Sequence, residues 1–81
     1  MNLEVISPEK KIFAGACSSV ILPGIDGRLE ILDRHAPLIA ALGEGDLKIT
    51  TSQGAQVMKI TGGFAEVNNN QVSILIEGLV K

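Results

Sequence analysis

Aromatic and cysteine residues are scarce in this 81-residue chain. It holds two Phe and neither Trp nor Tyr, so it offers no platform on which nucleic-acid bases could stack. A single cysteine, Cys17, excludes an internal disulfide and leaves no thiolate set for a structural zinc ion. Seven basic and nine acidic residues give a net charge of −2, too small to attract nucleic acid or anionic lipid from a distance. The composition therefore argues against a nucleic-acid-binding protein.

Long hydrophobic runs are also missing. Runs such as residues 20–22 and 38–42 fall far short of the ~18 residues that a membrane-spanning helix needs. The first four residues have neither the basic region nor the apolar segment of a secretory leader. Together with the free thiol, this predicts a cytoplasmic compartment. A hydrophobic content of 46% and a charged content of 20% are typical of one small globular domain.

Short apolar runs separated by turn residues make up the rest of the chain. Nine Gly and three Pro divide it at the spacing of roughly 8–12 residues that is typical of all-β domains. Apolar and polar residues alternate in 29–31, 47–51 and 72–74, which predicts strands with one buried side. Only residues 35–42 come near a helical pattern, and they are too short to decide between one turn and a short strand. These patterns predict an all-β sandwich or barrel.

Glycines predict where strands turn. Asp26-Gly27 predicts one tight hairpin and Gly54 the tip of another. Gly62-Gly63 interrupts a strand-like stretch, which indicates a bulge or a close approach of another backbone. We assign to the core, without a functional role, the following residues: Phe13, Ile49, Phe64, Val67, Val72 and Ile74.

Catalytic and phosphate-binding patterns are not found. His35 is the only histidine, and neither a nucleophile elbow nor a papain-like context surrounds Cys17. We interpret His35 as a surface or turn residue and Cys17 as a buried thiol. Gly43-Glu44-Gly45 begins like a dinucleotide-binding motif, but position 48 is Lys and no long helix follows. We therefore expect no catalytic residue, no metal and no cofactor, and favour a binding or structural role.

The order of the motifs resembles a known family. The elements in sequence are Val5-Ile6-Ser7-Pro8-Glu9-Lys10, Val20-Ile21-Leu22-Pro23-Gly24, His35-Ala36-Pro37-Leu38, Gly62-Gly63-Phe64-Ala65-Glu66-Val67 and Asn70-Gln71-Val72-Ser73-Ile74-Leu75. In this order and spacing, the chain resembles the N-terminal domain of the epsilon subunit of F-type ATP synthases over nearly its whole length. The His-Ala-Pro and Gly-Gly-Phe-x-Glu-Val elements are together specific.

The resemblance implies a fold and a role. It implies a single domain over residues 1–81, a flattened β-sandwich of about ten short strands. It also implies a non-catalytic rotor subunit that attaches the gamma subunit to the ring of c subunits, so that proton- or sodium-driven rotation reaches the catalytic head. Such a subunit lies at the cytoplasmic face of the bacterial inner membrane, held there through the ring. Most members continue into a C-terminal helical hairpin, which this sequence lacks, so we expect a short form without ATP binding.

The resemblance also implies which residues meet each partner. Arg28 is the expected anchor at the ring, because its guanidinium can bind carbonyl or carboxylate oxygens in pairs. For Leu38 and Leu42, a position in the core is an alternative as strong as a contact with gamma. The residues predicted to contact the c-ring are Gly24, Ile25, Asp26, Gly27, Arg28 and Glu30. Those predicted to contact gamma are His35, Ala36, Leu38, Ile39 and Leu42.

Two departures from the family pattern fall near these residues. Glu30 stands where the family usually has Gly, and Asp33-Arg34 stands where it has Pro-Gly. These changes alter the turn options and add charge to a surface expected to face a partner. Two alternatives stay open: a stand-alone β-module that binds a peptide or small ligand through an edge or face, and a hydrolase that uses His35 and Cys17.

Overall fold

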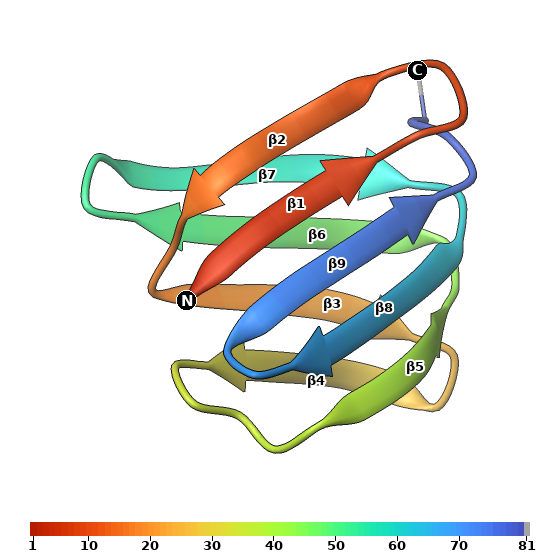
Figure 1. The fold of residues 1–81 in the computed structure, drawn as a ribbon. Helices are drawn as coiled ribbons and strands as arrows, with labels where there is room; N and C mark the ends of the chain where they lie inside the picture. The colour runs from red at the N-terminus through yellow and green to blue at the C-terminus, as the bar shows by residue number, and fades with distance from the viewer. Residues whose placement is uncertain (81) are drawn as a thin grey trace.

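The computed structural model describes residues 1–80, and these contain β-strands without a helix (Figure 1). Lys81, the last residue of the expected domain, lies outside the described residues. The strands are β1 (Asn2–Ile6), β2 (Lys11–Ala16), β3 (Ser19–Gly24), β4 (Gly27–Leu32), β5 (Leu38–Leu42), β6 (Gly45–Thr51), β7 (Gly54–Ile60), β8 (Gly63–Asn68) and β9 (Gln71–Ile76). No helix that could cross a membrane is therefore found in residues 1–80.

The strands form one continuous sheet that folds over into two layers (Figure 1). The hydrogen-bonded order is β2-β1-β9-β8-β5-β3-β6-β7, with β4 on β3. β5 makes the fold-over, because it pairs with β8 along its length but with β3 only through Leu42 and Gly24. The front layer of Figure 1 is therefore β2-β1-β9-β8-β5, and the back layer is β4-β3-β6-β7. The predicted flattened β-sandwich is confirmed, and Leu79 adds an isolated bridge to Ile60.

Alternating side chains build the core between the layers. Leu47 and Ile49 of β6 are fully buried, as the alternation in the sequence predicted. The same pattern in β9 buries Val72, Ile74 and Ile76 to 3% exposure or less. Burial of these aliphatic side chains is the main stabilising contribution in a sandwich without disulfides.

Two core assignments need correction. Phe64 is 60% exposed, because β8 turns Ala65 and Val67 inward and the strand period then places Phe64 outward. Phe13 is only partly buried and packs against the core from the edge strand β2. Residue type alone suggested that both phenylalanines are buried. The direction in which each side chain points from its strand determines how far it is buried. The other assigned core residues are buried, as predicted.

The predicted turns are confirmed. Gly24 pairs with Gly27 across a two-residue turn, and Gly27 has φ of 126°. Thr51 pairs with Gly54 across the β6–β7 turn, and Gly54 has φ of 121°. Both glycines occupy backbone conformations that other residues rarely adopt. Residues 35–42, which the sequence left undecided, become a loop followed by strand β5.

Candidate functional site

The residues predicted to contact a c-ring lie together on the β3–β4 hairpin. Ile25 and Asp26 form its turn, and Ile25 is 66% exposed. Arg28 and Glu30 are exposed on β4, because the residues that alternate with them turn toward the core. Among residues 1–80, neither of these charged side chains is in an ion pair. All the residues predicted to contact the c-ring therefore lie on this one hairpin: Gly24, Ile25, Asp26, Gly27, Arg28 and Glu30.

The residues predicted to contact gamma divide between surface and core. Ile39 is 75% exposed on the outer side of β5, and Ala36 is exposed in the loop before it. Leu42 is 5% exposed and belongs to the core, so its prediction as a surface contact is corrected. It lies where β5 folds over against β3, which turns its side chain between the layers. Leu38 is half-buried and packs against the core.

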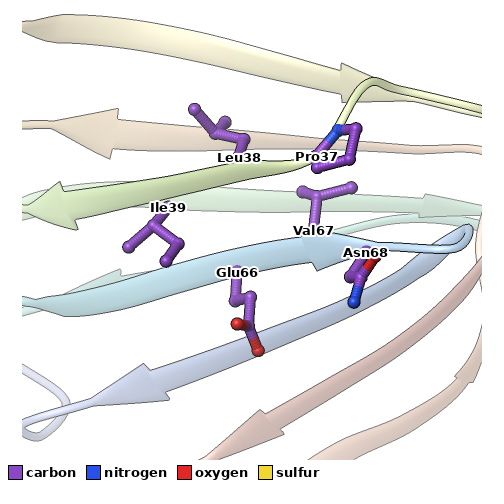
Figure 2. Close-up of a pocket in the computed structure, with 6 residues that line it drawn as sticks. All are labelled: Pro37, Leu38, Ile39, Glu66, Val67 and Asn68. Atoms are coloured by element: carbon purple, nitrogen blue, oxygen red, sulfur yellow. The ribbon is translucent and has the colours of Figure 1, made fainter.

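Figure 2 shows the outer and inner sides of the β5–β8 pair. Ile39 lies opposite Glu66, and both side chains point to one side of the pair. Leu38 lies opposite Val67 on the other side. Together with Pro37 and Asn68, these side chains line a shallow depression. The loop and β5 therefore share their exposed surface with β8, which the sequence did not predict as a contact strand.

Hydrogen bonds hold the β4–β5 loop against the β8–β9 turn. Asn70 donates through Nδ2 to Oδ1 of Asp33 at 3.0 Å, and its Oδ1 accepts from the backbone N–H of Arg34 at 2.8 Å. The amino group of Met1 donates to the same Asp33 oxygen at 3.0 Å. Next in the loop, His35 Nδ1 lies 2.7 Å from the carbonyl oxygen of Ala36. The side chains of Asp33 and Asn70, here called the loop clasp, thus fix the segment that leads into the predicted gamma contact.

Arg34 has a left-handed backbone conformation, which the glycine expected here from the family pattern would adopt without strain. Its φ of 62° is left-handed, where a side chain is strained and glycine is not. We expect Arg34→Gly to raise the free energy of unfolding by about 0.5–1 kcal/mol, measured by urea denaturation. Arg34→Ala removes the charge but keeps the strain, so it serves as the control. A gain for Arg34→Ala equal to that for Arg34→Gly contradicts the backbone explanation.

The bonds to Asp33 predict a pH dependence of stability. The hydrogen bond from the amino group of Met1, followed by that from Asn70, lowers the pKa of the Asp33 carboxyl from its ordinary value of 3.8. Because the pKa is lower in the folded chain, the carboxylate stabilises the fold above the ordinary value and loses this contribution as the pH falls through the depressed value. We expect the urea midpoints of the wild type and Asp33→Asn to differ at neutral pH and to converge below about pH 4.

The side chain of Asp33 is 58% exposed, so this effect is small and largest at low salt. Asp26→Asn, in the β3–β4 turn, is the matched control. Its urea midpoint should equal that of the wild type over the same pH range. A wild-type advantage over Asp33→Asn that stays constant down to about pH 2 contradicts the hydrogen-bond explanation.

Cys17 lies in surroundings that oppose nucleophilic chemistry. Its side chain is 6% exposed, in the connection between β2 and β3. Burial raises the pKa of the thiol, so the reactive thiolate is disfavoured at neutral pH. This weighs against the hydrolase alternative and agrees with the interpretation of Cys17 as a buried thiol.

An exposed apolar strip was missed by the sequence reasoning. Phe64 on β8 and Leu75 on β9 are 60% and 55% exposed, and they lie directly opposite each other. Ile39 of β5 is exposed on the same face, opposite Glu66 and two residues along the strand from Ala41, the partner of Phe64. The signal was present in residues 63–68, where strict alternation with Ala65 places Phe64 outward. Assigning the aromatic residue to the core overrode that signal.

A family model that matches the whole sequence shows the family to which the chain belongs. The model of the ATP synthase delta/epsilon chain beta-sandwich domain matches residues 1–81. The chain belongs to this family. The motif order that resembles epsilon subunits is thereby confirmed, and the ATP synthase delta/epsilon domain accounts for every residue of the sequence.

Curated members of the delta/epsilon family are close in sequence and longer. The ATP synthase epsilon chain of Leptospira interrogans is 43% identical over 77 residues, which are 95% of this chain and 61% of that protein. The epsilon chain of Nostoc sp. is 44% identical over 80 residues, which are 96% of this chain and 58% of that protein. The chain thus spans about three fifths of the length of these relatives.

Solved structures support the delta/epsilon fold. One is from a cryo-EM structure of the Tetrahymena thermophila mitochondrial ATP synthase central stalk and c-ring. It has a TM-score of 0.83 and 22% identity, over 99% of this chain and 65% of that one. The other is from the Euglena gracilis mitochondrial ATP synthase, with a TM-score of 0.89 and 23% identity, over 96% of this chain and 51% of that one. At these identities the likeness establishes the sandwich fold.

Proposed function

We propose that this chain is the β-sandwich part of a non-catalytic central-stalk subunit of an F-type ATP synthase. In this role it attaches the gamma subunit to the c-ring, so that ion-driven rotation is coupled to ATP synthesis. It is peripheral to the membrane, held through the ring at the cytoplasmic face of the bacterial inner membrane. The observation that carries the proposal is the family match over residues 1–81, with relatives named ATP synthase epsilon chain at 43–44% identity.

The spacing of the two candidate surfaces supports a coupling role. The β3–β4 turn precedes strand β4, and the clasped β4–β5 loop follows it. Six residues of β4 separate the two by about 20 Å at the usual rise of a strand. β4 is paired with β3 along its whole length, and β3 is paired with β6. A displacement of one surface is therefore passed to the other through hydrogen-bonded strands and not through a flexible linker.

Co-purification tests the proposed attachment. The tagged 81-residue chain is incubated with the gamma subunit, with the detergent-solubilised c-ring, and with both. We expect the chain to retain gamma alone and to retain the ring more strongly when gamma is present, because the two contacts act together. Retention of neither partner overturns the proposal. A peptide ligand bound without any affinity for gamma would instead support the stand-alone binding module.

Arg28→Glu tests the ring contact. The substitution reverses a charge on the exposed β3–β4 hairpin, so we expect the fold to be retained and ring retention to fall about threefold to tenfold. ATP-driven proton pumping in vesicles that contain the assembled enzyme should fall with it. Arg28→Lys keeps the charge and is the matched control. Pumping and ring retention at the wild-type level in Arg28→Glu would remove Arg28 from the contact.

A further inference from the structure

Strand β4 is a free edge of the back layer (Figure 1). It pairs with β3, and no other strand pairs with it among residues 1–80. The strands at the two ends of the sheet are protected. The carbonyl oxygen of Lys59 on β7 accepts a hydrogen bond from the backbone N–H of Val80, and a register shift interrupts the pairing of β2 with β1. β4 has neither form of protection, and a strand of a second chain can add to such an edge.

The pairing with β3 determines which backbone groups of β4 are free. Pro23, opposite Arg28, has no N–H, and its carbonyl oxygen accepts a hydrogen bond from the β5–β6 connection at 2.8 Å. The pair of Pro23 and Arg28 is therefore a non-hydrogen-bonded pair, and Arg28 directs its N–H and C=O away from β3. The same alternation directs those of Glu30 to the free edge, while the carbonyl oxygen of Leu32 accepts from the backbone N–H of His35.

The side chains at the two free positions have opposite charge. Arg28 and Glu30 are exposed on the outer face of the back layer, and neither is in an ion pair within the described part of the chain. Charges on an edge strand usually prevent pairing between copies, because they bring like charges together. A guanidinium and a carboxylate two residues apart have the reverse effect, since antiparallel pairing of two copies can place each opposite the other.

We infer that β4 is a self-association edge, at which two copies of this chain form a two-fold symmetric dimer by antiparallel pairing of their β4 strands. Arg28 of each copy lies opposite Glu30 of the other, and each of these pairs exchanges both of its N–H···O bonds. Leu29 of each copy lies opposite its counterpart at the two-fold axis. The back layers of the two copies thereby join into one continuous sheet.

Charge selects this register among those that the edge allows. The symmetric dimer pairs edge-facing residues with each other, because these have the free N–H and C=O groups. An axis at Arg28 would bring two cations together, and an axis at Glu30 would bring two carboxylates together. An axis at Leu29 places opposite charges together on both of its sides. Leu29 is half-buried against the core, so its remaining exposed surface is covered by its counterpart.

The dimer is weak and is a form of the unassembled chain. β4 has six residues, so its edge buries less than the ~800 Å² per partner of a stable interface. We therefore expect reversible association at about 100 µM and not a permanent dimer. Arg28 and Glu30 are also among the residues proposed to contact the ring, so a chain paired at β4 cannot use them there. The inference goes beyond the proposed function, because it concerns the chain before it binds any partner.

Sedimentation velocity of the isolated chain from about 5 to 500 µM tests the inference. We expect Arg28→Glu and Glu30→Arg each to raise the dissociation constant of the dimer about tenfold or more, because each brings like charges together in both pairs. The double variant Arg28→Glu/Glu30→Arg restores the opposite charges, so its constant should return to within about threefold of the wild type. Lys59→Glu makes the same charge change on β7, at another edge, and should leave the constant within about twofold.

Amide hydrogen exchange locates the contact on the edge. The N–H groups of Arg28 and Glu30 face solvent in the monomer, so they should exchange rapidly in dilute solution and become protected as the concentration rises to about 500 µM. The N–H of Leu29 faces β3 and is the internal control, which should be protected at every concentration.

The outcomes are decisive and separate from those of the proposed function. A chain that stays monomeric at about 500 µM overturns the inference, as does a dimer that Arg28→Glu and Glu30→Arg leave intact. A double variant that stays monomeric excludes the pairing of Arg28 with Glu30 and overturns it as well. Each result leaves the proposed function standing, because co-purification measures binding to gamma and the ring independently. Circular dichroism checks that each variant keeps the β-sandwich, and if one single variant unfolds, the other decides.

Discussion

Gly63→Ala is expected to be the most damaging single substitution in this sandwich. A Cβ at this position falls 2.1 Å from the carbonyl oxygen of Leu75 and 2.9 Å from the Cα of Ile76. Both atoms are backbone, so neither can move aside without opening the β8–β9 ladder, which begins with the pair of Gly63 and Ile76. The φ of Gly63 is 153°, which adds strain for any other residue. This is the close backbone approach that the glycine pair predicted.

The expected loss is about 3 kcal/mol or more of the free energy of unfolding, measured by urea denaturation. An 81-residue domain has about 4–12 kcal/mol in total, so much of its stability is lost. Gly54→Ala is the matched control, because Gly54 has φ of 121° but nothing within 4 Å of an added Cβ. It should lose only about 1 kcal/mol from backbone strain. Equal losses in the two variants would contradict the close-approach explanation.

Ile74→Ala is expected to have the second-largest effect. Ile74 is fully buried at the middle of β9, between Val5 of β1 and Ala65 of β8. Truncation removes apolar contacts and leaves a cavity that the paired strands cannot close, so we expect a loss of about 3 kcal/mol. The urea midpoint should fall while the denaturant dependence stays unchanged.

Leu75→Ala is the control for this prediction, because Leu75 is the next residue of the same strand and faces outward at 55% exposure. Its loss should stay within about 0.5 kcal/mol. Similar losses for Ile74→Ala and Leu75→Ala would contradict the assignment of the two faces of β9.

Neighbouring residues of one strand therefore serve different purposes. Ile74 stabilises the contact between the layers, and Leu75 presents an apolar side chain to the surroundings. Because the two side chains point to opposite faces, a partner can bind the outer face without disturbing the core. The proposed coupling role would need this separation, since the shape of the sandwich must persist while partners pull on its surfaces.

Local patterns determined much of the fold. Alternation in residues 47–51 and 72–74 predicted strands with the correct buried side, and Asp26-Gly27 and Gly54 predicted the hairpins that form. These features succeed because strand period and turn conformation depend on residues close together in the chain. The motif order in turn identified the family and the hairpin proposed to meet the ring.

Contacts between distant residues decided the rest, and only the tertiary structure contains them. Asn70 meets Asp33 across 37 positions, and β1 pairs in parallel with β9 from the far end of the chain. The fold-over at β5 turned Leu42 inward, and pairing with both β5 and β9 left Phe64 on the outer face. No local pattern determines which strand becomes a neighbour, because that choice depends on the joint burial of all the apolar faces. The exposed apolar side chains on the outer face are a product of that pairing.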